Sequence, residues 1–227
     1  MIVDAIIPAF NEEQSIALVV KGLDAGLLRD IIVADNGSTD GTPEIARKAG
    51  AVVVNEPVKG YGAACLAGVA WSLGQERQPD VIVFIDGDFS DYPEQLPQIL
   101  QPIREGRADL VIGSRALGRR DQGAMLPQQV FGNWLATRLI RMFYRYRFTD
   151  LGPFRAITRE AYERLGMKDR NFGWTVEMQV KAAKKKLRTV EVPVNYRVRI
   201  GKSKVTGTLK GSILAGYKIL LTIFRYL

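Results

Sequence analysis

The segment VFIDGDFSDYP, Val83–Pro93, begins as an apolar run and turns acidic at Asp86, Asp88 and Asp91. A short apolar run of this kind is typical of a strand buried in a parallel sheet. If the strand continues through Asp86 and Asp88, their side chains lie on the same face, because alternate residues of a strand point the same way. Carboxylates so close together repel each other unless a cation lies between them, and such oxygen ligands suit Mg²⁺ or Mn²⁺. The segment therefore predicts a metal site at Asp86 and Asp88, with a plain polar turn as the alternative.

Short runs of β-branched residues alternate with helical stretches along the first half of the chain. This order indicates an α/β fold with a mainly parallel, twisted sheet and helices on both faces. Ligands of such sheets bind beyond the carboxyl ends of the strands, which is where Asn11, Asp35, Asp86 and Asp88 fall. The expected strands are Val3–Pro8, Ile31–Asp35, Ala51–Asn55, Val81–Asp86 and Leu110–Gly113.

The second half of the chain has a different pattern, but no linker, low-complexity tract or repeat separates it from the first. Pro127–Phe148 is expected to form a long helix rich in arginine and aromatic residues, and Gly207–Leu227 a C-terminal amphipathic helix. We expect one domain over residues 1–227, with a first lobe at 1–115, a second lobe at 116–206 and the C-terminal helix at 207–227.

Composition excludes several kinds of chemistry. Cys65 is the only cysteine and the chain has no histidine, so an internal disulfide, a cysteine-based zinc site and catalysis by an imidazole are all excluded. The N-terminal residues lack the pattern of a signal peptide, which predicts a cytoplasmic protein. The longest apolar tract, Ile213–Leu227, contains Lys218 and Arg225 and is shorter than the ~20 apolar residues that a spanning helix needs.

Charge divides the chain unevenly. Residues 1–100 contain 6 Lys or Arg and 15 Asp or Glu, whereas residues 101–227 contain 26 and 9. A basic half of this size favours an anionic partner, which can be a nucleic acid, an anionic membrane surface or a phosphorylated substrate. A solvated basic surface without a partner is the alternative.

Further motifs fall at the same predicted edge of the sheet: IPAFNEEQS after the first strand, VADNGSTDGT after the second, KGYGAACLAG before a helix and GSR after the fifth strand. Together with Asp86 and Asp88, their order and spacing resemble family 2 of the nucleotide-sugar glycosyltransferases, which has the GT-A fold. The glycines of KGYGAACLAG do not follow the first strand, as those of a dinucleotide fingerprint do, so a dehydrogenase is disfavoured.

The resemblance implies roles for individual positions. The family binds its donor diphosphate and a divalent cation at the positions of Asp86 and Asp88, and Lys59 and Arg115 match positions near the donor. Asn36 stands where the family often has a second acid, which leaves the base selectivity open. The donor is expected to be of the GDP-mannose or UDP-glucose type. The positions that match the nucleoside pocket are Pro8, Phe10, Asn11, Glu12 and Asp35.

The segments TDLGPFRAI, Thr149–Ile157, and EVPVNYRVRIGKSKV, Glu191–Val205, resemble the polyprenyl-phosphate branch of the family. The family matches Phe154 and Arg155 but has Ser-Gly where this chain has Gly152 and Pro153. The resemblance implies inverting transfer of a hexose to a polyprenyl phosphate, an acceptor that is already an anion and needs cations more than a general base. The expected catalytic residues are Asp88, Arg155, Arg199 and Lys204, with Lys202 as a further phosphate ligand.

A lipid acceptor requires a surface that contacts the membrane, here its cytoplasmic face. Lys210, Lys218 and Arg225 are spaced to lie on one side of the C-terminal helix, and Arg138, Arg141 and Arg145 recur along the earlier helix. Helices that simply pack on the core are the alternative for both. Two other functions stay open: transfer to a soluble phosphorylated metabolite or glycan, and nucleic-acid binding, which would leave the polar motifs at the sheet edge unexplained.

Overall fold

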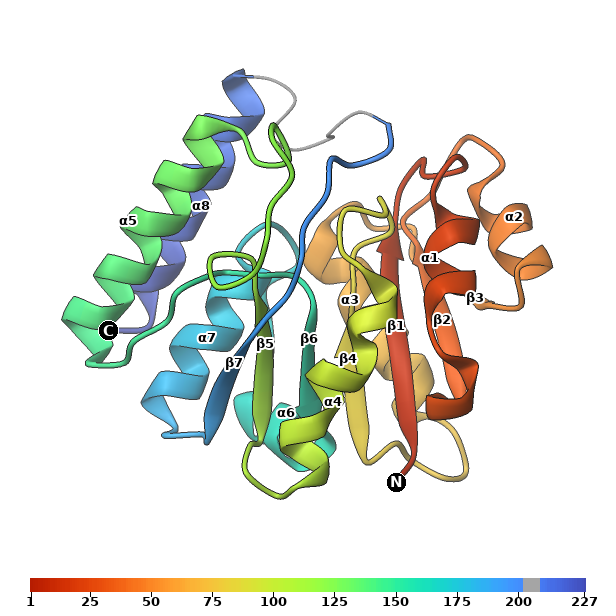
Figure 1. The fold of residues 1–227 in the computed structure, drawn as a ribbon, viewed down its shortest axis with the longest axis horizontal. Helices are drawn as coiled ribbons and strands as arrows, with labels where there is room; N and C mark the ends of the chain where they lie inside the picture. Colours follow the sequence, from red (N-terminus) through yellow and green to blue (C-terminus); the bar gives the residue numbers. More distant parts are fainter. Residues whose placement is uncertain (202–208) are drawn as a thin grey trace.

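The computed structural model describes residues 1–201 and 209–227, with side chains from residue 216 onward in the second range. Strands in these ranges form a seven-stranded sheet in the order β3-β2-β1-β4-β6-β5-β7 (Figure 1). All neighbouring strands are parallel except β6, which runs antiparallel to both β4 and β5. The predicted α/β fold with a mainly parallel sheet is therefore confirmed. The strands are β1 Val3–Ala9, β2 Asp30–Asp35, β3 Val52–Asn55, β4 Val81–Phe84, β5 Leu110–Ser114, β6 Arg155–Thr158 and β7 Thr189–Pro193.

Helices cover both faces of the sheet. One face packs against α1, α2 and α4, and the other against α3, α6 and α7. The long helices α5 and α8 lie side by side beyond α7 (Figure 1). The helices are α1 Ile16–Gly22, α2 Thr42–Lys48, α3 Tyr61–Leu73, α4 Leu96–Arg104, α5 Pro127–Tyr144, α6 Arg159–Leu165, α7 Trp174–Lys184 and α8 Leu209–Arg225, with short 3₁₀ turns η1 Ala25–Leu27 and η2 Pro93–Gln95.

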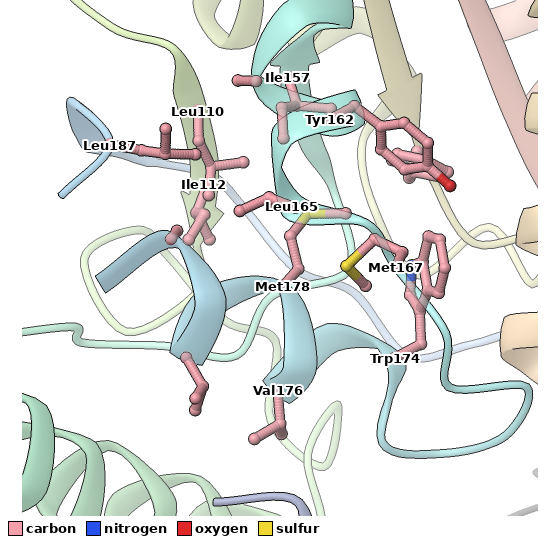
Figure 2. Close-up of a cluster of buried hydrophobic side chains, with 14 of the residues drawn as sticks. Leu110, Ile112, Ile157, Tyr162, Leu165, Met167, Trp174, Val176, Met178 and Leu187 are labelled. Atoms are coloured by element: carbon pink, nitrogen blue, oxygen red, sulfur yellow. The ribbon is translucent and has the colours of Figure 1, made fainter. Parts of the chain in front are cut away.

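The larger hydrophobic cluster lies between the sheet and α7. Figure 2 shows side chains of α6 and α7 meeting those of β5 and β6, with Met178 and Trp174 among them. The Trp174 ring contacts the Phe84 ring edge-on, with 5.6 Å between centroids. Because Phe84 is the last residue of β4, this packing fixes the strand end from which the acidic segment departs.

The acidic segment is not an extension of the strand. β4 ends at Phe84, where its pairing with β6 also ends opposite Arg155, and the chain then turns through Gly87 and Asp88. Phe89 adopts a left-handed conformation with φ 60°. The expectation that Asp86 and Asp88 are extended residues on one face is therefore wrong, because the chain leaves the sheet and turns before it reaches Asp88.

The two long helices also differ from expectation. α5 ends at Tyr144 rather than Phe148, because Arg145 takes a left-handed conformation, with φ 54°, and caps the helix. In α8 the ammonium of Lys218 lies 3.0 Å from the Asp169 carboxylate and so faces the protein rather than a lipid surface. Arg225 is exposed, and the Lys210 side chain lies outside the described residues. Among the helices described, none combines the length and apolar character needed to cross a bilayer.

Candidate active site

A cavity of about 340 Å³ opens at the carboxyl ends of β1 and β4, as the topology of the sheet predicts. Residues from both halves of the chain line it, so its walls form only when the fold brings distant segments together. The lining residues are Pro8, Ala9, Phe10, Glu12, Asn36, Lys59, Gly60, Tyr61, Ala64, Asp86, Gly87, Asp88, Asn171, Phe172 and Arg199.

Asp86 and Asp88 both reach this cavity although they belong to a turn. Asp86 accepts a hydrogen bond from the Tyr61 hydroxyl at 2.9 Å, and Asp88 accepts one from the backbone N–H of Ser90, also at 2.9 Å. Burial, reinforced by the negative charge of Asp88, raises the pKa of Asp86 to about 7. A carboxyl with so high a pKa gains from a nearby cation, which stabilises its ionised form.

Arg199 connects the acidic turn to the segment that follows β1. Its guanidinium lies 3.1 Å from the Glu12 carboxylate and 3.3 Å from that of Asp88, so it crosses the cavity between them. The backbone N–H of Ile200 donates to the Asp88 carbonyl at 3.0 Å. The segment that carries Arg199 is thereby fixed directly above the acidic turn.

Arg197 reinforces this attachment two residues earlier. Its guanidinium stacks 3.6 Å from the centroid of the Phe89 ring and 4.0 Å from that of Tyr92, and its backbone N–H donates to the Ser90 carbonyl at 2.9 Å. The left-handed Phe89 backbone thus turns its ring toward the arginine.

Phe10 and Lys59 form another part of the cavity wall. The Lys59 ammonium lies 3.8 Å from the centroid of the Phe10 ring and donates to the carbonyls of Asn36 and Gly37 at 2.8 and 2.9 Å. This arrangement places an aromatic face and a cation together, which suits a base and an adjoining phosphate.

Asn36, the residue that departs from the acidic pattern, has a structural role here. Its amide nitrogen donates to the carbonyls of Glu56 and Val58 at 2.9 and 2.8 Å, and its amide oxygen accepts from the Gly60 N–H at 2.7 Å. The side chain therefore fastens the loop that carries Lys59, and an aspartate could not make the two donor contacts.

Most of the predicted site residues that the structure describes line the cavity, but some do not. Asn11 accepts from the Thr39 N–H at 2.8 Å and Asp35 from the Ser38 N–H at 3.2 Å, so both shape the loop after β2 behind the pocket. Lys204 and Lys202 lie outside the described residues. The predicted residues that line the cavity are Pro8, Phe10, Glu12, Lys59, Asp86, Asp88 and Arg199.

The structure does not bring Arg115 or Arg155 to the cavity. Arg115 makes a two-pronged ion pair with Asp150, with nitrogen to oxygen distances of 2.8 and 2.7 Å. Arg155 is 0% exposed and donates to the backbone carbonyls of Leu151, Gly152 and Thr175. Arg155 thus has no surface with which to contact an acceptor here, and its position indicates a structural role in place of the expected phosphate contact.

Sequence reasoning missed Tyr61, Asn171 and Phe172. Tyr61 belongs to the motif KGYGAACLAG, whose place at the ligand edge was a usable signal. Asn171 and Phe172 carry no such signal, because they reach the cavity only through the packing of their loop against α3.

No cluster of three or more acidic, histidine or cysteine side chains suited to a metal is present in residues 1–201 and 209–227. A cation held by Asp86 and Asp88 would therefore take its other ligands from substrate and water, as Mg²⁺ commonly does. Asp91 is also buried nearby, and within the described part of the chain its carboxyl oxygens have no hydrogen-bond partner.

Comparison with known sequences gives consistent matches. Residues 4–166 match the sequence family described as Glycosyl transferase family 2. The chain is 38% identical over 215 residues to an uncharacterized glycosyltransferase of Mycobacterium tuberculosis, covering 94% of each chain. It is 34% identical over 218 residues to an undecaprenyl-phosphate mannosyltransferase of Micrococcus luteus, covering 91% of this chain and 88% of that one.

Solved structures share the fold. Glucosyl-3-phosphoglycerate synthase from Mycobacterium tuberculosis, in complex with phosphoglyceric acid, superposes with a TM-score of 0.76 at 23% identity, covering 99% of this chain and 79% of that one. The same enzyme has been solved with Mn²⁺, uridine diphosphate and glucosyl-3-phosphoglycerate, with a TM-score of 0.75 at 23% identity and the same coverage. The GT-A fold that the sequence motifs predict is thereby confirmed.

Proposed function

Because the chain belongs to glycosyltransferase family 2, we propose that it transfers a hexose from a nucleoside-diphosphate sugar to a phosphate-bearing acceptor. The observation that carries this proposal is the cavity at the strand ends, which Asp86, Asp88, Lys59 and Arg199 all line and in which Arg199 pairs with Asp88. Carboxylates that can share a divalent cation, beside side-chain cations, suit a diphosphate. A donor of the GDP-mannose or UDP-glucose type fits this site, and Phe10 offers a face on which its base can stack.

Asp86 and Asp88 fit a bound Mg²⁺ or Mn²⁺. Their oxygens are the hard ligands that these ions prefer, and the raised pKa of Asp86, caused by burial and by Asp88, indicates a site that gains from added positive charge. When bound, the cation would offset the negative charge on the departing nucleoside diphosphate. Arg199 can also offset this negative charge, provided that its guanidinium leaves the Asp88 carboxylate and pairs with a phosphate of the donor.

One candidate for the acceptor is a polyprenyl phosphate. The similarity to an undecaprenyl-phosphate mannosyltransferase supports it. So does the outward side of α5, where large apolar side chains are exposed beside arginines, with Phe131 at 60% and Trp134 at 55%. Such a surface suits an interface with anionic lipid. We refer to this surface as the α5 face, and it consists of Leu126, Val130, Phe131, Trp134, Arg138, Arg141, Met142 and Arg145.

The second candidate is a soluble phosphorylated acceptor. The solved enzyme of the same fold binds phosphoglyceric acid, a small molecule of this class, and Lys218 of α8 pairs with Asp169 instead of facing lipid. The two candidates share one requirement, a cationic site for the acceptor phosphate. They differ in whether an apolar surface must take part.

The transfer itself follows from the chemistry of the groups present. A phosphate monoester is an anion near neutral pH, so its oxygen can attack the anomeric carbon of the donor while the bond to the diphosphate breaks. This requires positioning and cationic neutralisation more than proton removal, which agrees with a chain that has no histidine. We expect a direct displacement with inverted anomeric configuration and no glycosyl-enzyme intermediate.

A two-stage assay tests the proposal. A panel of nucleotide sugars with Mn²⁺ should raise the melting temperature for one donor, and that donor should then label either a polyprenyl phosphate or phosphoglyceric acid. Transfer only to the lipid supports the first candidate, and transfer only to the soluble acid supports the second. Binding of no nucleotide sugar, or NMR showing a retained anomeric configuration, would contradict the proposed donor site or mechanism respectively.

A further inference from the structure

The loop at residues 168–173, between α6 and α7, forms one wall of the cavity because it supplies Asn171 and Phe172. Its inner side is attached to the start of α3. The backbone N–H of Ala63 donates to the Arg170 carbonyl at 2.9 Å, and this close approach of two backbones holds the loop at the edge of the pocket.

The outer side of the same loop is attached to the C-terminal helix. One oxygen of Asp169 accepts from the backbone N–H groups of Asn171 and Gly173 at 2.7 and 3.2 Å, and the other lies 3.0 Å from the Lys218 ammonium of α8. A Cβ at Gly173 would lie 2.6 Å from the hydroxyl oxygen of Thr222, one turn further along α8, and 2.6 Å from an Asp169 oxygen, so the three residues pack closely. One carboxylate therefore links the loop backbone to α8.

A second link from α8 reaches the start of the loop through Glu177, which is fully buried in α7. Glu177 accepts hydrogen bonds from the backbone N–H groups of Lys168 and Asp169 at 3.0 and 2.7 Å. It also accepts from the Tyr226 hydroxyl of α8 at 2.7 Å and pairs with Lys181 at 2.6 Å. Burial raises and these hydrogen bonds lower the pKa of Glu177, and the net shift is downward.

We propose that α8 is a brace for the donor pocket, and that Lys218 and Tyr226 are positioning residues that act through Asp169 and Glu177 on the loop at 168–173. This inference rests on the proposed function, since it takes the cavity to be the donor site. The charges of α8 alone did not suggest this role. It follows from Lys218, whose ammonium pairs with Asp169 of the loop. α8 runs alongside α5 (Figure 1) and contacts both α5 and α7.

The experiment compares Lys218→Met and Tyr226→Phe with the unaltered protein. Affinity is measured for UDP and for GDP, each with Mn²⁺, by titration calorimetry. We expect the dissociation constant of the nucleotide that binds to rise about tenfold for Lys218→Met, the effect of losing a charge-assisted contact, and about threefold for Tyr226→Phe. The donor KM should rise in proportion while kcat and the acceptor KM stay within about twofold.

Rescue and control variants separate positioning from general stability. Lys218→Arg keeps the ion pair and should restore donor affinity, whereas Lys48→Met on α2 and Tyr217→Phe, on the exposed side of α8, should change nothing. Asp169→Asn keeps the acceptor for the loop amides but loses the charge, so combining it with Lys218→Met should add no further loss.

Hydrogen exchange makes the inference testable without any ligand. The amides of Ala63, Asn171 and Gly173 should exchange faster in Lys218→Met than in Lys48→Met. If the unaltered protein binds neither nucleotide, the proposed donor site is wrong. The amide exchange rates of Lys218→Met then decide by themselves whether α8 braces the loop. Unchanged exchange in Lys218→Met, or a nucleotide affinity that stays the same, would overturn the brace and leave the proposed function standing.

Discussion

Replacing Asp86 with Asn should stabilise the metal-free protein at pH 8 while it abolishes metal-dependent transfer. Burial and the neighbouring Asp88 raise the pKa of Asp86 from an ordinary 3.8 to about 7. At about 1.4 kcal/mol per pKa unit, keeping this carboxyl ionised in the fold costs at most about 4 kcal/mol. Because the residue is partly exposed at the cavity, water relieves some of this cost, and about 2 kcal/mol is the expected gain.

The sign of the pH dependence follows from proton binding. Between the ordinary pKa and about 7, the folded protein binds more protons at Asp86 than the unfolded chain does. Stability from this group is therefore present below about pH 4 and is lost as the pH rises towards 7. Asp86→Asn should match the unaltered protein at pH 4 and exceed it at pH 8 by roughly 4 to 8 °C in melting temperature. Mn²⁺ should stabilise only the unaltered protein.

The assay is thermal unfolding of both proteins from pH 4 to pH 8, in chelator and in Mn²⁺. Tyr61 can still donate to the amide oxygen of Asn at position 86, so the geometry of the turn is retained. Equal pH slopes for the two proteins in chelator would refute the reasoning, because they would mean that Asp86 is not held in an unfavourable site. Equal stabilisation of both by Mn²⁺ would place the cation elsewhere.

Other substitutions test separate parts of the structure. Asp88→Asn should lower Mn²⁺-dependent transfer by about a hundredfold or more with little loss of stability, as measured by initial rates and circular dichroism. Trp134→Ser on the α5 face should reduce sedimentation with anionic vesicles without changing the melting temperature. The control Leu18→Ser, at an exposed position of α1, should change neither sedimentation nor melting temperature. Gly62→Ala should destabilise the fold by several kcal/mol, because its Cβ would overlap a backbone carbonyl oxygen, while Gly132→Ala, with open space in α5, should stabilise it by up to about 1 kcal/mol in denaturant unfolding.

The sequence predicts the first five strands to within two residues at each end, because each is a short apolar run bounded by polar residues, but it gives no bounds for β6 and β7. The prediction Leu110–Gly113 differs from β5 only at its last residue, Ser114. The predicted strand Val81–Asp86 is too long, because the apolar run continues to Ile85 whereas β4 ends at Phe84. Strand ends are set by where the partner strands stop, and that information lies elsewhere in the chain.

The site is predictable to the extent that its residues follow strands. Asp86, Asp88 and Phe10 reach the cavity because the topology of the sheet puts them there. Arg155 and Arg199 were both assigned by resemblance, yet only Arg199 lines the cavity. The difference is that backbone carbonyls surround Arg155 whereas carboxylates face Arg199, and a sequence does not show which acceptors will surround a guanidinium.

The excess of cations in the second half of the chain is a weaker argument for an anionic partner than its size suggests. Acids of the first half already neutralise some of these cations: Arg170 pairs with Glu56, Arg197 with Glu94, and Arg199 with Glu12 and Asp88. The charge of the second half alone counts these cations fully, although each lies beside a carboxylate of the first half and so presents less field to a membrane or a nucleic acid. The α5 face is different, because its arginines are exposed and lie beside apolar side chains. With about 1 kcal/mol for each cation near an anionic surface, attraction to lipid should follow the charge of this face rather than that of the whole half.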